Sequence, residues 1–114
     1  MDECIFCKII NKEIPAKVVY EDDRIVAFDD IYPQAPVHVL LISKEHFASL
    51  NDIPEEKKEL LGHIISKAKQ VAQEKGVKES GYRIVLNTAR DSGQDVFHIH
   101  FHVLGGRRMT WPPG

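Results

Sequence analysis

Cysteine is scarce in this sequence: only two of its 114 residues are cysteines. Both lie in one Cys-x-x-Cys pair, Cys4 and Cys7, so they cannot join distant segments as the disulfides of small secreted proteins do. Such a pair can instead be a redox couple, half of a metal site, or a coincidence. Redox pairs of this kind follow a strand, and no strand precedes Cys4, so a metal site is the preferred interpretation.

Long apolar runs and an excess of one charge are also missing. No stretch approaches the roughly 18 apolar residues of a membrane span, and residues 1–7 lack the basic start and apolar run of a secretory signal. The formal net charge of -2 argues against a nucleic-acid partner and against binding to anionic membranes. We therefore expect a cytoplasmic protein with neither nucleic acid nor membrane among its partners.

The composition is sufficient for one hydrophobic core. Hydrophobic residues make up 43% of the chain and charged residues 28%, an ordinary globular balance. No repeat, low-complexity segment or linker divides the sequence. We expect a single domain over residues 1–114, in which residues 105–114 form a C-terminal tail.

Hydrophobic periodicity predicts two helices and five strands. Residues 4–11 have the pattern of a short helix, and a long amphipathic helix begins with Asp52 as its cap and ends at Gly76. Strands are predicted at 18–21, 25–28, 38–43, 82–87 and 97–104. Short connections between successive strands imply antiparallel pairing. The predicted fold class is α+β, with an antiparallel sheet of about five strands, one long helix and a short N-terminal helix.

Histidine is the residue type that stands out, with six copies. His98, His100 and His102 alternate with apolar residues in the last predicted strand, so their imidazoles should share one face. Such a row suits either a metal centre or nucleophilic catalysis by one imidazole. The neutral donors Asn87 and Gly93-Gln94 lie nearby, and they suit a phosphate or oxyanion better than a metal.

Two further histidines lie on other predicted elements. His38 heads the apolar strand at 38–43 and could reach the histidine row. His63 lies off the apolar stripe of the long helix, and we expect it to be exposed and uninvolved.

The segment His98-Ile99-His100-Phe101-His102-Val103-Leu104 matches the pattern His-φ-His-φ-His-φ-φ, where φ is apolar. This pattern, with flanking matches such as 33–36, 93–94, 105–107 and 111–114, resembles the histidine triad superfamily. The likeness is to its branch of histidine triad nucleotide-binding proteins, and to bacterial members with an N-terminal Cys-x-x-Cys. The resemblance implies a HIT-like fold and a homodimer.

The same resemblance implies an enzyme that hydrolyses purine nucleoside 5'-phosphoramidates and related adenylylated compounds to a nucleoside monophosphate. The middle histidine, His100, would be the nucleophile and would form a covalent nucleotidyl-histidine. His102 and His38 would be its catalytic neighbours, and His102 would also contact the phosphate. A nucleotide-binding scaffold with little turnover is the alternative, and a metalloenzyme that uses the histidine row is a third possibility.

The resemblance also assigns the nucleotide site. Asp30 would bind the ribose hydroxyls, while Asn87, Gly93 and Gln94 would bind the phosphate. Asp95 stands where eukaryotic relatives have a serine, which puts the substrate preference in question. The purine slot would be formed by Ile5, Phe6, Phe28, Ile31 and Leu40.

In related proteins the N-terminal Cys-x-x-Cys binds zinc together with two histidines. The matching residues here are Cys4, Cys7, His46 and His98. Two thiolates and two imidazoles make a closed tetrahedral site, so the zinc would be structural, and no organic cofactor is expected. The family's C-terminal tail crosses to the partner subunit, and this likeness extends to Trp111.

Overall fold

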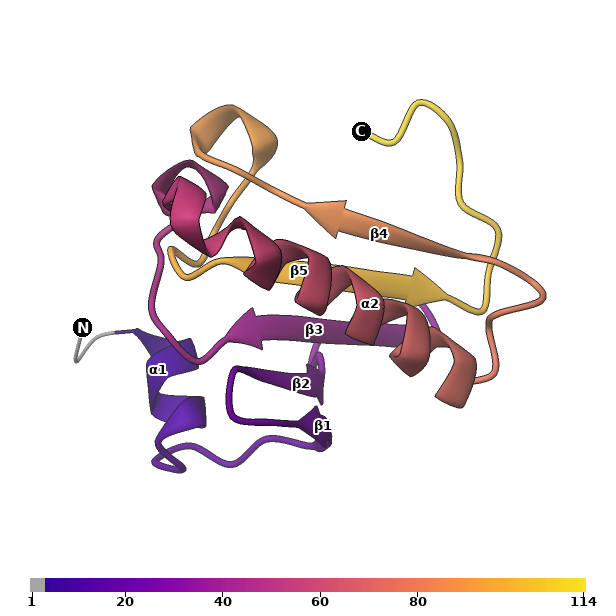
Figure 1. Ribbon diagram of the computed structural model, residues 1–114. Helices are drawn as coiled ribbons and strands as arrows, with labels where there is room; N and C mark the ends of the chain where they lie inside the picture. The colour runs from indigo at the N-terminus through magenta and orange to yellow at the C-terminus, as the bar shows by residue number, and fades with distance from the viewer. Residues whose placement is uncertain (1–3) are drawn as a thin grey trace.

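The computed structural model describes residues 4–114 (Figure 1). Five strands form one antiparallel sheet in the order β1-β2-β3-β5-β4, which confirms the predicted α+β class and places β3 in the middle. The strands are β1 Val18–Glu21, β2 Ile25–Asp29, β3 Val37–Ser43, β4 Tyr82–Leu86 and β5 His100–Gly105.

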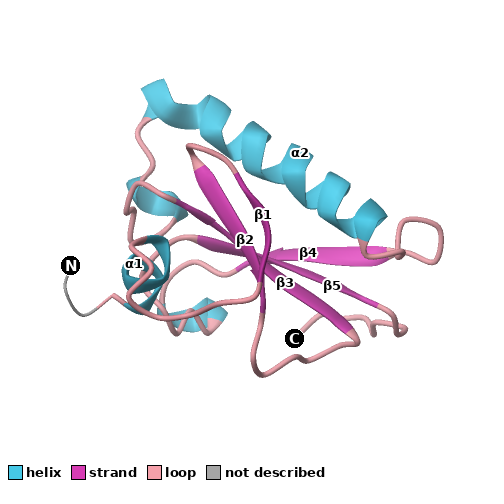
Figure 2. Cartoon of the chain, turned by 90° about the horizontal axis from the view of Figure 1, so that it is seen from below, coloured by secondary structure: helices cyan, strands magenta, loops and turns pink. Residues whose placement is uncertain are grey.

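The sheet has a hydrophobic core on each face. On one face, α2 (Lys58–Glu74) lies along the strands, as Figure 2 shows, and packs Ile64 and Ala68 against Ile25 and Leu41. The other face packs against α1 (Ile5–Ile10), whose Phe6 belongs to a smaller cluster. That cluster also contains Val26, Phe28, Leu40 and Ile42. Because alternate side chains of a strand point to opposite faces, β2 and β3 contribute to both cores.

Asp52 does not cap the long helix, so that prediction was wrong. Two short 3-10 helices, η1 Leu50–Asp52 and η2 Glu55–Lys57, precede α2. Ser49 caps η1, where its Oγ accepts a hydrogen bond from the Asn51 amide at 3.1 Å. The extended backbone of Pro54 separates η1 from η2, and regular α-helix begins only at Lys58.

The C-terminal end of α2 agrees with the prediction. Gly76 has φ +79° and donates its amide to the Gln73 carbonyl, while the Val77 amide donates to Ala72. This pair of bonds is a Schellman motif, in which glycine adopts the left-handed conformation that ends the helix.

The last strand is shorter than predicted, because β5 begins at His100 and not at Phe97. The ladder with β3 ends at the pair Ile42–His100. The preceding segment is held elsewhere: the Ile99 amide donates to Phe47 O at 2.7 Å, and His98 Nε2 donates to Ser43 O at 2.7 Å. His98 is therefore turned toward the loop after β3, while His100 and His102 lie on the strand.

None of the described helices is long and apolar enough to cross a membrane.

Candidate functional site

A cavity of about 250 Å³ lies between α1 and the face of the sheet that carries His100 and His102. Most of the residues assigned to the nucleotide site line it. These are Ile5, Phe6, Phe28, Asp30, Ile31, Leu40, Asp95, His100 and His102. Apolar walls with a few polar groups at one end are typical of small-molecule sites.

In its neutral form, His100 presents an unprotonated nitrogen to this cavity. Its Nδ1 lies 2.8 Å from the backbone carbonyl oxygen of His98, and because a carbonyl can only accept, Nδ1 carries the proton. In the neutral ring the lone pair is then on Nε2. The Phe6 ring packs edge-on against the imidazole at 5.1 Å between centroids and restricts its orientation. His100 is thus a buried imidazole whose Nδ1 proton is fixed by the backbone.

A hydrogen-bonded chain sets the proton positions of the other two imidazoles. The Gln34 amide donates to His38 Nδ1 at 3.0 Å, so the proton of neutral His38 is on Nε2. His38 Nε2 donates to His102 Nδ1 at 2.9 Å, which leaves the proton of neutral His102 on Nε2. His102 can therefore donate a hydrogen bond into the cavity.

Burial keeps these two imidazoles neutral. Burial, with added repulsion from His100 and His38, lowers the pKa of His102 to about 4. The pKa of His38 is also lowered by burial, although Asp30 opposes the shift. Both rings therefore keep the tautomers described above at neutral pH.

Asp30 lies beside this chain. Its Oδ1 accepts from the Tyr32 amide at 2.8 Å, and its Oδ2 lies 3.5 Å from His38 Nε2. Asp30, His38 and His102 place ligand atoms within 4.8 Å of one another, so the group could hold a metal ion. Each of the three side chains also has a hydrogen-bond partner within the protein, so the group is satisfied without a metal ion.

Three residues assigned to the phosphate site are not on the cavity wall: Asn87, Gly93 and Gln94. The buried Gln94 side chain accepts from the Ala89 amide at 2.8 Å and donates to the carbonyls of Ala48 and Val96 at 2.8 and 3.0 Å. Gln94 therefore holds two loops together before β5, and its side chain has few free hydrogen-bonding positions for a ligand.

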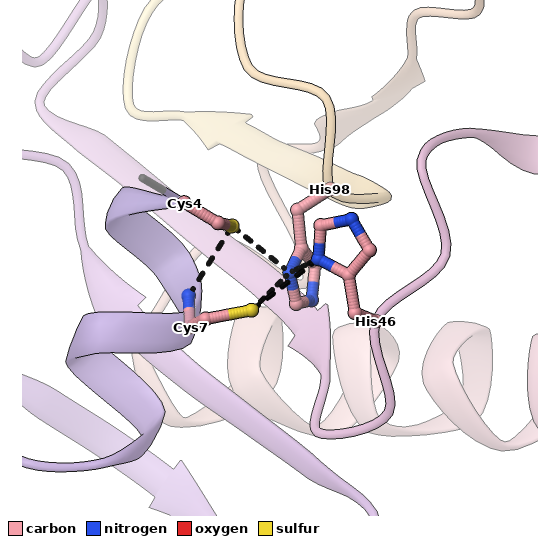
Figure 3. A group of neighbouring side chains, drawn as sticks. All are labelled: Cys4, Cys7, His46 and His98. Atoms are coloured by element: carbon pink, nitrogen blue, oxygen red, sulfur yellow. Dashed lines mark hydrogen bonds between the residues drawn. The ribbon is translucent and has the colours of Figure 1, made fainter. Parts of the chain in front are cut away.

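Cys4, Cys7, His46 and His98 form a second cluster (Figure 3), with one ligand atom from each lying within 4.8 Å of the others. The structure thus brings together four residues that are 94 positions apart at their extremes. His98 Nδ1 lies 3.4 Å from Cys4 Sγ, 3.6 Å from Cys7 Sγ and 3.1 Å from His46 Nδ1. His98 is fully buried.

The donor chemistry of this cluster fits a metal ion. His98 Nε2 donates to Ser43 O, so its Nδ1 carries the lone pair that points at the other three groups. A tetrahedral ion with bonds of about 2.0–2.3 Å holds its ligand atoms roughly 3.3–3.8 Å apart, close to the separations seen here. Burial and the neighbouring Cys4 raise the pKa of the Cys7 thiol to about 11, so a cation is needed to make it a thiolate near neutral pH.

The cavity also has wall residues that sequence reasoning did not assign to it. They are Ile9, Ile14, Pro15, Ala16, Asp29, Tyr32 and Val96. Nothing in the pattern of the Ile-Pro-Ala run after α1 predicts that it lines the cavity.

His63 is not an uninvolved histidine, so that expectation was wrong. Its Nε2 lies 2.8 Å from Asp22 Oδ2, which also accepts from the Tyr20 hydroxyl at 2.7 Å. Asp22 lies in the turn between β1 and β2, so the contact joins α2 to that hairpin. No periodicity in the sequence pairs position 63 with position 22.

Comparison with known proteins places this arrangement in a class. A family model described as the C-terminal binding region of the scavenger mRNA decapping enzyme matches residues 3–110. An uncharacterised HIT-like protein of Synechocystis is 51% identical over 113 residues, which are 99% of this chain and 98% of that protein. A HIT family hydrolase from Legionella pneumophila superposes with a TM-score of 0.95 at 55% identity, covering 98% of this chain and 100% of the other.

The chain therefore belongs to the histidine triad (HIT) family. Among its relatives with a named activity is the purine nucleoside phosphoramidase of Escherichia coli. That enzyme is 48% identical over 108 residues, which are 95% of this chain and 91% of the relative.

Proposed function

We propose that the protein is a hydrolase that cleaves the P–N bond of purine nucleoside 5'-phosphoramidates and related adenylylated compounds, releasing a nucleoside monophosphate. The observation that carries the proposal is the His100 tautomer, with Nδ1–H bonded to the His98 carbonyl and the Nε2 lone pair free in the cavity. The likeness to a purine nucleoside phosphoramidase supports the choice of substrate.

In the first step His100 Nε2 attacks the α-phosphorus and forms a P–N bond to the enzyme. The bond from phosphorus to the substrate nitrogen breaks, and its electron pair stays with the departing amine. The amine takes a proton from His102, which must first take up a second proton from solvent as the anionic phosphate binds, so that donation returns the ring to its neutral form. In the second step water attacks phosphorus, its proton returns to His102, and the P–N electron pair returns to His100. The two steps together consume one water and release the amine and the nucleoside monophosphate.

The nucleotide would lie along the cavity with its base among the apolar residues near Phe6 and Leu40. A carboxylate accepts two hydrogen bonds, which suits the vicinal ribose hydroxyls, and Asp30 lies on the wall beside the catalytic chain. Gln94 would contribute by fixing the loop before β5, whose residues Asp95 and Val96 line the cavity.

We propose zinc as the ion held by Cys4, Cys7, His46 and His98, because two sulfur and two nitrogen ligands are its usual structural set. With four protein ligands the ion supplies no open position for chemistry. Its contribution is to tie α1, the loop after β3 and the segment before β5 together, and the last of these carries the carbonyl that orients His100.

We propose a homodimer in the cytoplasm as the working form. In support, β4 pairs with β5 alone and leaves its other edge free among the described residues, and Trp111 in the tail is 82% exposed. Light scattering on purified protein tests the dimer: a mass near 13.0 kDa would contradict it and a mass twice as large would support it.

Hydrolysis of adenosine 5'-phosphoramidate tests the proposed function. The His100→Asn variant should lose at least about a thousandfold in kcat/KM, while His63→Gln, which lies outside the cavity, should not. Brief treatment with EDTA at a temperature where circular dichroism shows no unfolding should leave activity unchanged. Loss on chelation with His100→Asn still active would indicate a metal centre, and nucleotide binding without turnover in any form would indicate a scaffold protein.

A further inference from the structure

The carboxylate of Asp95 lies beside the nucleophile. Its Oδ1 is 4.0 Å from His100 Nε2, and the side chain lines the cavity although it is 85% exposed. Asp95 follows Gly93 and Gln94, and the buried Gln94 side chain anchors this loop to Ala48 and Val96. The loop that carries the Asp95 carboxylate at the cavity is therefore held in place by the hydrogen bonds of Gln94.

The other two carboxylates on the cavity wall already have partners. Asp29 pairs with Lys75 Nζ at 3.0 Å, and Asp30 accepts from the Tyr32 amide and lies against His38. Among the described residues that line the cavity there is no lysine or arginine. Among the described residues of the cavity wall, Asp95 is the one whose carboxylate lies within 4.0 Å of His100 Nε2.

This arrangement is unusual for a site that binds a phosphate, because a carboxylate repels an anion at this distance. A substrate that carries a second, positive group on its leaving amine turns the repulsion into attraction. The leaving amine lies on the phosphorus opposite the attacking nitrogen, and its substituent extends toward the open mouth, since the apolar end receives the base. Asp95 is exposed at that mouth.

We propose that Asp95 is a specificity-determining residue that selects phosphoramidates whose leaving amine bears a cationic group. The inference rests on the proposed function and adds a substrate class to it: nucleoside phosphoramidates of diamines or of other cationic amines. Anionic leaving groups, such as amino acids with a free carboxylate, are disfavoured by the same charge.

Three adenosine 5'-phosphoramidates of similar size test the selection, with 1,3-diaminopropane, n-butylamine or β-alanine as the leaving amine. For the wild type, kcat/KM should fall from the cationic to the neutral to the anionic substrate, with roughly tenfold between the extremes at low salt. Raising the ionic strength should reduce this ratio because the groups interact through water.

The variants assign the effect to one residue. Asp95→Asn should bring the ratio near unity, and Asp95→Lys should reverse the order. Asp91→Asn is the matched control, because Asp91 is an exposed acidic residue of the same loop region that pairs with Arg90. An unchanged ratio in Asp95→Asn, with the butylamine substrate still turned over, overturns this inference alone. No turnover of any of the three substrates overturns the proposed function and this inference together.

Discussion

The imidazoles of His100 and His38 differ in which nitrogen carries the proton, and a neighbouring backbone group decides it in both. His100 donates from Nδ1 to a carbonyl, whereas His38 accepts at Nδ1 from an amide. The two rings therefore present opposite chemistry, a lone pair in one and a proton in the other. Identical side chains therefore differ in which nitrogen can accept and which can donate a hydrogen bond, and these contacts make the difference.

Acid should destabilise the folded protein through His102. Its pKa is about 4 in the folded state and near 6.5 in an unfolded chain, so between these values only the unfolded chain takes up the proton. The free energy of unfolding should then fall as the pH drops from about 6.5 to 4, by up to about 1.4 kcal/mol per pH unit for one proton. The lowered pKa of His38 acts in the same direction.

Chemical denaturation between pH 8 and 4 measures this dependence. The His102→Asn variant should show a shallower fall in the free energy of unfolding over the pH 6.5 to 4 window than the wild type does. Parallel curves for the two proteins would contradict the assignment to His102.

At the scale of the elements, the end of α2 offers a comparison within one helix. Gly76 has φ +79°, so Gly76→Ala should cost roughly 1 kcal/mol although a Cβ there meets nothing within 4 Å. Gly62 lies inside α2 with no such φ and equal space, so Gly62→Ala should stabilise by about 0.5–1 kcal/mol. Thermal unfolding of both variants checks the opposite signs, and equal shifts would contradict the role of the left-handed cap.

Most of the elements could be predicted from the sequence because their periodicity is strong and local. The hairpin around Asp22, the middle strand and the stripe of α2 all follow from such patterns. The start of β5 could not, since it depends on Phe47 and Ser43, which draw the segment before His100 out of the ladder. The cap at Asp52 failed for a similar reason, because Pro54 divides the turn into two short helices.

The candidate site was predictable where one motif carried it and less so where several loops meet. The alternation predicts that His98, His100 and His102 share one face of the last strand. The structure agrees for His100 and His102, whereas His98 precedes β5 and belongs to the cluster with the cysteines. The Gln94 side chain bonds to the backbone of Ala48, and the Ile-Pro-Ala run lines the cavity; both contacts depend on long-range packing. No local pattern encodes either feature. The assigned roles of the site residues, like the single domain over residues 1–114, stay predictions.

For the molecule as a whole, removal of a metal ion should lower the thermal stability of the fold more than it lowers the catalytic rate. The four-residue cluster joins α1, the loop after β3 and the segment before β5. Because ion binding adds to the folding free energy, prolonged dialysis against a strong chelator should lower Tm, and Zn²⁺ should restore it. Cys4→Ser should have a lower Tm than the undialysed wild type, and dialysis should change the Tm of this variant little. Less than a tenth of an equivalent of metal in protein purified without chelator would contradict the site.

His98 takes part in two sites, one through its side chain and the other through its main chain. Its ring belongs to the metal cluster, but the group that sets the His100 proton is its main-chain carbonyl. A carbonyl persists through any replacement of the side chain, and the neighbouring Ile99 amide still holds the segment to Phe47. A descendant of this protein could therefore lose its cysteines by mutation and still keep the carbonyl that orients the His100 ring.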